Sequence, residues 1–436
     1  MTELPIAVIG AGPQGLAAAA HLLERGLEPL VLERGPAAGA AVAEWHDVRT
    51  FSPWPELVDA AARRLLARAG WVEPGAGYPT GADWARDYLI PLAAALGPRV
   101  RTGTAVTGIA RTGGDRSADA GRSATPFEIH TVDADGREGR IAARAVIDAG
   151  GTWSGPRPAG ASGLPARGER TASASGRIGY RIPAASELGA LAGKHVAVIG
   201  GGHSASHAVI RLAELAAREP GTRVTWLIRR GTPSGLASAD DQLPERGALG
   251  RRADATVSSG RVERVARFRT AAFDPGADGR LAVVGEDGRR VGSVDRVIAL
   301  TGFRPDTSFL GELRIALDPS LEAVAGLAEQ IDPNVHSCGT VRASGVTQLT
   351  HPEPDFYIVG AKSYGRAPTF LALTGYEQVR SIAAELAGDH EAARRNELVL
   401  PESGACGGSG ADADATSCCT VPAPASTQFI TLGARP

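Results

Sequence analysis

The sequence predicts a three-layer α/β fold with two Rossmann-like, dinucleotide-binding units, and three observations support this prediction. An apolar run at 6–9 leads into a glycine-rich turn at 10–15 and then into a helical pattern. The same order of strand, glycine turn and helix begins again at 195. Each unit then closes on an apolar strand, at 145–149 and 291–300, that ends in a small residue and glycine. Such an internal repeat is a stronger signal than either glycine turn alone.

The first glycine turn has the spacing G-x-G-x-x-G. Gly10 permits a tight turn after the strand, Gly12 lets the backbone approach a pyrophosphate, and Gly15 lets helix and strand pack closely. Glu33 ends the second apolar strand, where a carboxylate can accept both hydroxyls of a ribose. We therefore expect a dinucleotide site here; the alternative is a glycine-rich turn in an ordinary β-α-β unit.

The second glycine turn, at 200–205, differs from the first in the residues at the end of its second strand. Arg229 and Arg230 stand there in place of an acid. Because arginine pairs with a 2′-phosphate that an acid would repel, the pattern favours NADPH over NADH. A solvated arginine pair is the alternative, since arginine is common in this chain. Glu33 in the first unit suits an unphosphorylated ADP moiety, as in FAD, so the two units imply a bound flavin and a diffusible nicotinamide nucleotide.

Composition limits the classes of function. The chain has 436 residues and a net charge of −2, so nothing indicates binding to nucleic acid or to an anionic membrane. It shows neither a basic leader nor an apolar segment long enough to span a bilayer, and we expect a cytoplasmic protein. Its four cysteines form no C-x-x-C, which excludes a thioredoxin-type redox pair.

Four segments are predicted along the chain. They are the first part of an FAD-binding domain (1–155), an NADPH-binding domain (176–300), the second part of the FAD-binding domain (301–395) and a disordered, cysteine-containing tail (396–436). Each nucleotide unit carries an inserted hairpin or meander. We expect helices over 56–69, 81–96 and about 369–386, strands over 100–110, 127–132 and 138–142, and a hairpin-like stretch that begins with 255–269.

An ordered set of motifs resembles a known family. The set is GAGPQG at 10–15, GGTWS at 150–154, GGGHSA at 200–205, LTGFRPD at 300–306 and YIVG…GYEQVR at 357–380. Over roughly 4–390 the chain resembles flavin-containing monooxygenase-like oxidoreductases, and is similar to the flavin monooxygenases encoded in bacterial arsenic-resistance operons. The resemblance implies an FAD- and NADPH-dependent enzyme with a small-molecule substrate, for which a trivalent arsenical is a candidate; a homodimer is an open alternative to a monomer.

The resemblance also implies which residues hold the cofactors. For FAD these are Gly10, Gly12, Pro13, Gly15, Glu33, Arg34, Trp45, Arg49, Ser52, Trp54 and Val106. For NADPH they are Gly200, Gly202, His203, Ser204, Ala205, Arg229 and Arg230. Gly302, Gly360, Thr369 and Gln378 complete the set, and the helix that starts near Thr369 would point its N-terminus at the pyrimidine edge of the flavin.

The motifs leave the electron acceptor open. The phenylalanine-glycine-histidine fingerprint of such monooxygenases is missing, because the stretch 171–191 contains no histidine. One alternative is a reductase or oxidase that passes electrons to a metalloid, a disulfide partner or oxygen without hydroxylation. Another is a non-catalytic sensor or metalloid-binding adaptor with a bound flavin.

No residue is assigned a catalytic role. His46 could donate a proton beside the flavin or be a hydrogen-bonded loop residue, and Lys362 could place a positive charge near the flavin or face solvent. Cys406, Cys418 and Cys419 are of the type that binds As(III) or Hg(II), but an incidental thiol cluster in a tail is the alternative. The sequence otherwise predicts no metal site, and Cys338 is expected to be a small buried residue.

Overall fold

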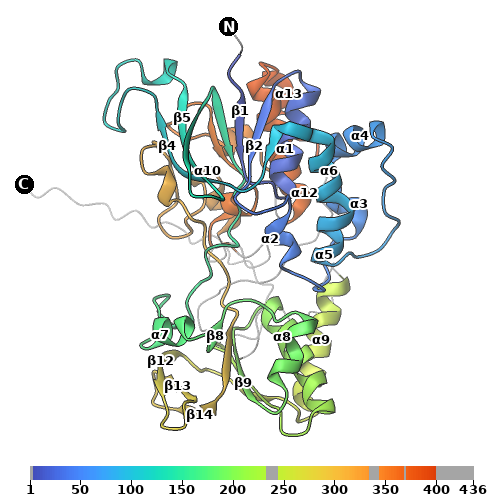
Figure 1. The fold of residues 1–436 in the computed structure, drawn as a ribbon, viewed down its shortest axis with the longest axis vertical. Helices are drawn as coiled ribbons and strands as arrows, with labels where there is room; N and C mark the ends of the chain where they lie inside the picture. The colour runs from blue at the N-terminus through green and yellow to red at the C-terminus, as the bar shows by residue number, and fades with distance from the viewer. Residues whose placement is uncertain (1–2, 232–243, 333–342, 368–369, 399–436) are drawn as a thin grey trace, which may run out of the picture.

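The computed structural model describes residues 3–231, 244–332, 343–367 and 370–398, which form two bodies joined by two connecting segments (Figure 1). The N-terminal and C-terminal portions together make one body, and the middle of the chain makes the other. Thr369, Cys338 and the three cysteines of the predicted tail lie outside the described residues. Within the described residues, no helix has the length and apolar character needed to cross a membrane.

The first body is built on a parallel sheet of five strands. In spatial order these are β16 (Phe356–Ile358), β7 (Ala145–Asp148), β1 (Ile6–Ile9), β2 (Pro29–Leu32) and β3 (Val100–Arg101). The strands β1, β2, β7 and β16 are buried along their whole length, which is why they read as continuous apolar runs. The edge strand β16 comes from the portion of the chain after the middle body, so two distant segments share one sheet.

Helices and a meander cover the two faces of this sheet. The helix α1 (Pro13–Glu24) packs against α12 (Ala372–Leu386) and α4 (Ala60–Arg68), and the four alanines at 17–20 let these helices approach closely because their side chains are small. The strands β4 (Thr104–Arg111), β5 (Phe127–Asp133) and β6 (Glu138–Ala143) form an antiparallel meander. The apolar side chains of this meander join the same core, and the three predicted layers are confirmed.

The second body repeats this plan. Its parallel sheet contains β11 (Glu263–Val265), β10 (Arg223–Leu227), β9 (His195–Ile199), β15 (Arg296–Ala299) and β8 (Ile178–Gly179), in that spatial order. Side chains alternate along β9: Val196 and Val198 pack with the helices α8 (His203–Arg218) and α9 (Pro244–Ser258), while Ala197 and Ile199 pack with the meander. That meander consists of β12 (Thr270–Pro275), β13 (Leu281–Gly285) and β14 (Arg290–Val294).

Short helices complete the described fold. The α-helical and π-helical ones are α2 (Ala40–Ala43), α3 (Trp54–Leu57), α5 (Gly81–Trp84), a π-helical turn (Ala85–Leu89), α6 (Ile90–Leu96), α7 (Glu169–Ala174), α10 (Ala325–Ile331), α11 (Val346–Leu349) and α13 (His390–Arg394). The 3-10 helices are Gly97–Arg99, Arg122–Ala124, Ala185–Leu191, Ser308–Leu310 and Gly360–Tyr364. The continuous helix predicted over 56–69 is wrong near its start, because the chain leaves the helix at 58–59. Asp59 has an extended backbone there, and its carboxylate accepts a hydrogen bond from the Ala62 backbone N–H at 2.9 Å, which starts α4 afresh.

Three other predicted boundaries are also wrong. Residues 255–258 are the end of helix α9 and not the start of a hairpin. The strand predicted over 291–300 is two strands, separated at Asp295. The strand predicted over 100–110 is interrupted at 102–103, where Gly103 has a φ of +62°. In each of the last two cases, the backbone bends within a stretch that the apolar pattern alone predicts to be one continuous strand.

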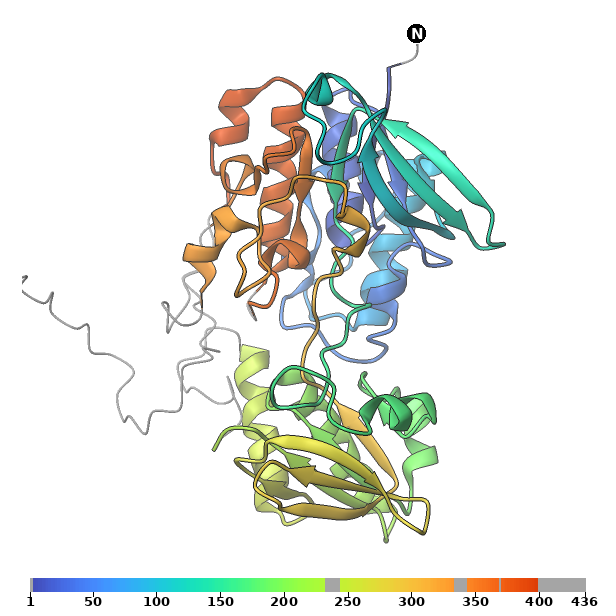
Figure 2. The same cartoon turned by 90° about the vertical axis from the view of Figure 1, so that its left-hand side faces the viewer.

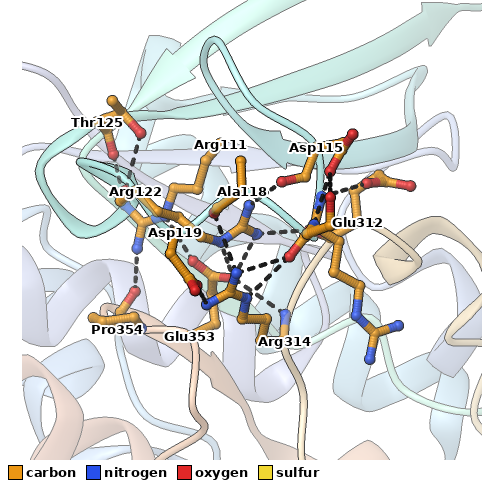
Figure 3. Close-up of polar contacts among 12 residues, drawn as sticks. Arg111, Asp115, Ala118, Asp119, Arg122, Thr125, Glu312, Arg314, Glu353 and Pro354 are labelled. Atoms are coloured by element: carbon orange, nitrogen blue, oxygen red, sulfur yellow. Dashed lines mark hydrogen bonds and ion pairs between the residues drawn. The ribbon is translucent and has the colours of Figure 1, made fainter.

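A buried ionic network fastens the first meander to the body (Figure 3). The carboxylate of Glu353 accepts hydrogen bonds from Arg111 Nε at 2.8 Å and from Arg122 Nη2 at 2.8 Å. The backbone N–H of Arg314 donates to the same carboxylate at 3.1 Å. Burial alone would raise the pKa of Glu353, but the two arginines hold this pKa below its ordinary value. The carboxylate therefore stays charged and joins residues more than 200 positions apart.

The two segments that connect the bodies pair with each other. Pro156 and Phe303 form an antiparallel bridge, the Arg304 N–H donates to the Gly155 carbonyl at 2.7 Å, and the Trp153 ring stacks on Phe303 at 4.7 Å. The Arg157 N–H adds a hydrogen bond to the Gly302 carbonyl at 2.9 Å. We call residues 153–157 and 302–304 the paired linkers; they run between the bodies in Figure 2.

Candidate cofactor sites

The first glycine turn (10–15) joins β1 to α1 and leaves one side open. Gly10 has a φ of +94°, and a Cβ there would lie 2.9 Å from the Ala149 carbonyl oxygen. A Cβ on Gly15 would lie 1.9 Å from the Gly10 oxygen. A Cβ on Gly12, by contrast, would meet no atom within 4 Å. The first and third glycines are therefore required by packing, while the second faces free space that a ligand can approach.

Glu33 lies beside this turn, at the end of β2. One carboxylate oxygen accepts the Ala11 N–H at 2.7 Å, and the other accepts the Gly35 N–H at 2.7 Å. The bond from Ala11 holds the carboxylate against the first glycine turn, where the sequence predicts contact with a ribose, and the bond from Gly35 fixes the orientation of the carboxylate. The adjoining Arg34 is exposed.

The second glycine turn (200–205) has the same geometry. Gly200 has a φ of +136°, and a Cβ there would lie 2.2 Å from the Leu300 carbonyl oxygen. A Cβ on Gly202 would meet nothing within 4 Å. Ala205 takes the third position and is fully buried. The indole N–H of Trp226 donates to the Gly200 carbonyl at 2.7 Å and fixes the turn over the sheet.

The helices that follow these turns begin without side-chain caps. Neither α1 nor α8 has a capping hydrogen bond from a side chain or an acidic residue in its first turn, and the same holds for α12. By contrast, Asp59, Thr80 and Asp389 cap α4, α5 and α13. The N–H groups at the start of α1, α8 and α12 are therefore open to an anionic ligand, which the positive end of a helix dipole favours.

The aromatic loop at 45–54 lies between the two bodies. The Trp45 ring lies 6.1 Å from Trp84 and 6.2 Å from Trp153, and its indole nitrogen is buried with no hydrogen-bond partner among the described residues. Ser52 and Trp54 are buried. Arg49 is exposed and donates to the Tyr78 carbonyl at 2.6 Å. The structure thus places part of the predicted flavin loop in the interior and part at the surface.

His46 and Lys362, the two residues considered for a catalytic role, have different surroundings. His46 is exposed, has a φ of +51°, and lines an open cavity of about 930 Å³ between the bodies. Lys362 is buried, and its ammonium lies 2.6 Å from the Asp148 carboxylate at the end of β7. The interpretation of Lys362 as a solvent-facing loop residue is therefore wrong. Its neighbour in space, Asp148, also accepts the Gly150 N–H at 3.0 Å.

The turn after β16 lies against the first glycine turn through a glutamine. A Cβ on Gly360 would come 3.2 Å from Gln14 Cγ, and one on Gly375 would come 2.5 Å from the same atom. Gln378 is fully buried, and its side-chain oxygen accepts the Gly360 N–H at 2.8 Å. Gln378 can therefore act on a cofactor only indirectly, by holding Gly360 and Ser363 in place. The sequence reasoning missed Gln14 and Gly375, for which the only signal was that each lies inside a quoted motif.

The remaining predicted residues are spread over both bodies. Val106 is half-buried in β4, Arg229 is exposed after β10, and Gly302 is exposed in a paired linker with a φ of +99°. His203 and Ser204 form the first turn of α8, where the His203 ring meets Phe51 edge-on at 5.1 Å. Arg230 is half-buried, and its carbonyl accepts the Arg267 N–H at 3.0 Å.

Both turns fit the diphosphate of a dinucleotide. Each offers a glycine whose α-carbon faces free space, followed by a helix whose first N–H groups no side chain caps. At the start of α12 the Thr374 hydroxyl is also buried without a hydrogen-bond partner among the described residues. The residues present therefore suit two nucleotide cofactors.

Solved structures share this fold at low sequence identity. Bacillithiol disulfide reductase from Bacillus cereus matches at 20% identity with a TM-score of 0.66, over 89% of this chain and 99% of that one. Ornithine hydroxylase from Pseudomonas aeruginosa matches at 19% and 0.58, over 90% and 100%. A flavin-containing monooxygenase from Stenotrophomonas maltophilia matches at 23% and 0.53, over 90% and 99%. No curated protein sequence matches the chain.

A match to a whole family covers most of the chain. The profile of the pyridine nucleotide-disulphide oxidoreductases matches residues 7–326, which include both glycine turns and both paired linkers. This match, together with the geometry of the two turns, confirms the expected fold class and the expected use of a pyridine nucleotide. The chain therefore belongs to the pyridine nucleotide-disulphide oxidoreductase family.

Proposed function

We propose that the chain is an NADPH-dependent flavoenzyme in which the first glycine turn holds FAD and the second binds NADPH. The observation that supports this most is the pair Gly12 and Gly202. Each faces free space at an uncapped helix, while the glycines before them are closed by backbone contacts. Glu33 beside the first turn suits a ribose without a phosphate, as in FAD. Arg229 beyond the second turn suits the 2′-phosphate on the ribose of NADPH.

The chain's own residues bind and orient. FAD, when bound, supplies two-electron redox chemistry, and NADPH is the hydride donor. Glu33 is already fixed by two backbone N–H groups, so it is pre-organised to accept ribose hydroxyls. The start of α12 places backbone N–H groups and the Thr374 hydroxyl where negative charge can be stabilised. The buried Asp148–Lys362 pair holds the strand end of β7 against the turn that follows β16.

Where the electrons go next is the finer part of the proposal. Our first choice is a monooxygenase-like enzyme linked to arsenic resistance, with a trivalent arsenical as candidate substrate. The motif resemblance supports it, and so does the absence of a C-x-x-C in the sequence, which removes the dithiol that a thioredoxin-type reductase needs. The second candidate is a reductase that passes electrons on without hydroxylation, favoured by the structural likeness to a bacillithiol disulfide reductase.

Three glycine-to-alanine variants test the assignment of the two sites. The Cβ of alanine at position 12, 202 or 189 meets no atom within 4 Å, so all three variants should fold. We expect Gly12→Ala to lose FAD, and Gly202→Ala to keep FAD but bind NADPH at least about tenfold more weakly. Gly189→Ala, away from both turns, is the matched control. The readouts are the flavin absorbance after reconstitution and its bleaching by NADPH under anaerobic conditions.

Two outcomes would contradict the proposal. The first is a wild-type protein that stays colourless after incubation with FAD; the second is a flavin that NADPH never bleaches. The electron acceptor is then tested by mixing the NADPH-reduced protein with oxygen. One peroxide released per NADPH supports an oxidase, whereas NADPH consumption coupled to an oxygenated arsenical, with little peroxide, supports the monooxygenase.

A further inference from the structure

Three arginines on or near the paired linkers are close enough for their charges to interact. Arg157 and Arg304 lie on the two paired linkers, and Arg366 comes just after the turn that succeeds β16. Their charges act on one another: burial, and then the nearby charges of Arg304 and Arg366, lower the pKa of Arg157. Like charges in a half-buried place repel, so a cluster of this kind costs stability unless something supplies the opposite charge.

The chain supplies little of that charge. Arg366 donates to the Glu322 carboxylate at 2.5 Å, and this bond, with the charges of Arg304 and Arg157, lowers the pKa of Glu322. One carboxylate, bonded to Arg366 alone, is thus the counter-charge near all three guanidinium groups. Arg304 donates from Nη2 to the Gly163 carbonyl at 2.8 Å, which is a neutral partner.

Several donors of the cluster are left over. The Nε atoms of Arg304 and Arg366 are buried, and neither has a hydrogen-bond partner among the described residues. The Arg157 guanidinium is half-buried and makes no side-chain hydrogen bond or ion pair within the same part of the chain. Guanidinium groups match the two oxygens of a carboxylate or a phosphate, and a desolvated donor without an acceptor is costly.

We propose that Arg157, Arg304 and Arg366 form a binding site for an oxyanion, and that the site holds the carboxylate or phosphate of the substrate. The inference rests on the proposed function and narrows it, because a trivalent arsenical fits this site only if the molecule also carries a carboxylate or phosphate group. Two members of the cluster, Arg157 and Arg304, lie on the segments that join the two bodies. It disfavours a substrate that is only cationic, such as a diamine.

The same chemistry could come from the phosphates of NADPH, since Arg229 also acts on Arg157. The experiment therefore has two arms. In the first, inorganic phosphate is titrated into the full-length FAD-loaded protein in a calorimeter, against sodium chloride at matched ionic strength. We expect one phosphate per chain, and at least about tenfold weaker binding in Arg157→Gln and Arg366→Gln. Arg137→Gln, an exposed arginine paired with Asp135 in a hairpin turn, is the matched control.

The second arm measures NADPH binding to the same variants. Unchanged NADPH affinity, with phosphate and NADPH bound together, supports a substrate site. If Arg157→Gln weakens NADPH as much as phosphate, and NADPH displaces phosphate, the oxyanion belongs to the cofactor and the substrate assignment is overturned. Phosphate that does not bind the wild type, or that binds both glutamine variants as tightly, overturns the site itself.

Folding and function are controlled separately. Removing one of several like charges should not unfold the protein, and thermal unfolding checks this; phosphate should raise the melting temperature of the wild type but not of the variants. Phosphate binding requires no electron transfer. A protein that binds phosphate through these arginines but is not reduced by NADPH would therefore contradict the proposed function and leave the oxyanion site standing.

Discussion

The Lys362 ammonium lies 2.6 Å from a carboxylate oxygen of Asp148, and both side chains are buried. The two residues are 214 positions apart, so their contact joins the end of β7 to the turn after β16. A second partner of the lysine is the Phe309 ring, whose centre lies 4.4 Å from the ammonium nitrogen.

Replacing only one member of this pair should be strongly destabilising. Lys362→Met leaves the Asp148 carboxylate buried without its cation, and we expect a loss of about 3–5 kcal/mol in the free energy of unfolding. The double variant Asp148→Asn with Lys362→Met should lose less than the sum of the two single variants. Urea unfolding of all three, with and without FAD, measures the coupling; a Lys362→Met protein as stable as wild type would show that the pair contributes nothing.

Glu353 should govern the acid stability of the first body. Its folded pKa lies below the ordinary value of 4.5, so its contribution is present above that value and is lost as the pH falls through the lowered pKa. Glu353→Gln leaves Arg111 and Arg122 without a counter-charge, and we expect a loss of about 3–5 kcal/mol near neutral pH. Glu128→Gln, at a surface pair with His130, is the control. Melting curves between about pH 6 and about pH 3 on wild type and both variants check both points.

His207 should make the second body less stable in mild acid. Burial, and then the charge of Arg211, lower its pKa from 6.5 to about 4. Between these two pKa values His207 is protonated in the unfolded chain but not in the folded chain. The free energy of unfolding therefore falls as the pH drops from 6.5 to about 4. His207→Leu should flatten this decline, whereas the exposed His130→Gln should not. Equal pH profiles for His207→Leu and wild type would contradict the prediction.

Arg229 should set the preference between NADPH and NADH. It lies just after β10, at the position where an arginine can pair with a 2′-phosphate. A charged hydrogen bond of about 1.5–3 kcal/mol corresponds to roughly 10–100-fold in affinity, so Arg229→Gln should lose that much for NADPH and nothing for NADH. Arg223, at the other end of the same strand and paired with Glu263, provides the control variant. Dissociation constants come from anaerobic flavin reduction; unaltered NADPH binding would place the 2′-phosphate elsewhere.

Most of the fold could be predicted from local sequence patterns. The two glycine turns could be predicted because each role is set by residues within a few positions, such as the contact between Gly15 and Gly10. Predicted boundaries were wrong where a single residue changes the direction of the backbone, as at Asp59. The hydrogen bond by which Asp59 caps the helix cannot be predicted from a hydrophobic pattern. The buried runs of both sheets were found because strands covered on two faces must be apolar throughout.

The partners of buried charges could not be predicted. Lys362 is one of only two lysines in the sequence, but its partner Asp148 lies 214 residues away and no local spacing connects the two. The same holds for Glu353, which meets Arg111 and Arg122 from over 200 residues away. In a chain so rich in arginine, composition also hides which arginines are buried, so the cluster of Arg157, Arg304 and Arg366 required a structure.

The hydrogen bonds between the paired linkers have a mechanical consequence. Because Arg304 bonds to Gly155 and Trp153 stacks on Phe303, neither connection can bend by itself. One body can reorient against the other only if both paired linkers twist together. The molecule therefore has a single hinge between its two bodies. A ligand that binds to either paired linker would therefore make this connection stiffer. Binding of that ligand would then be coupled to the distance between the two nucleotides.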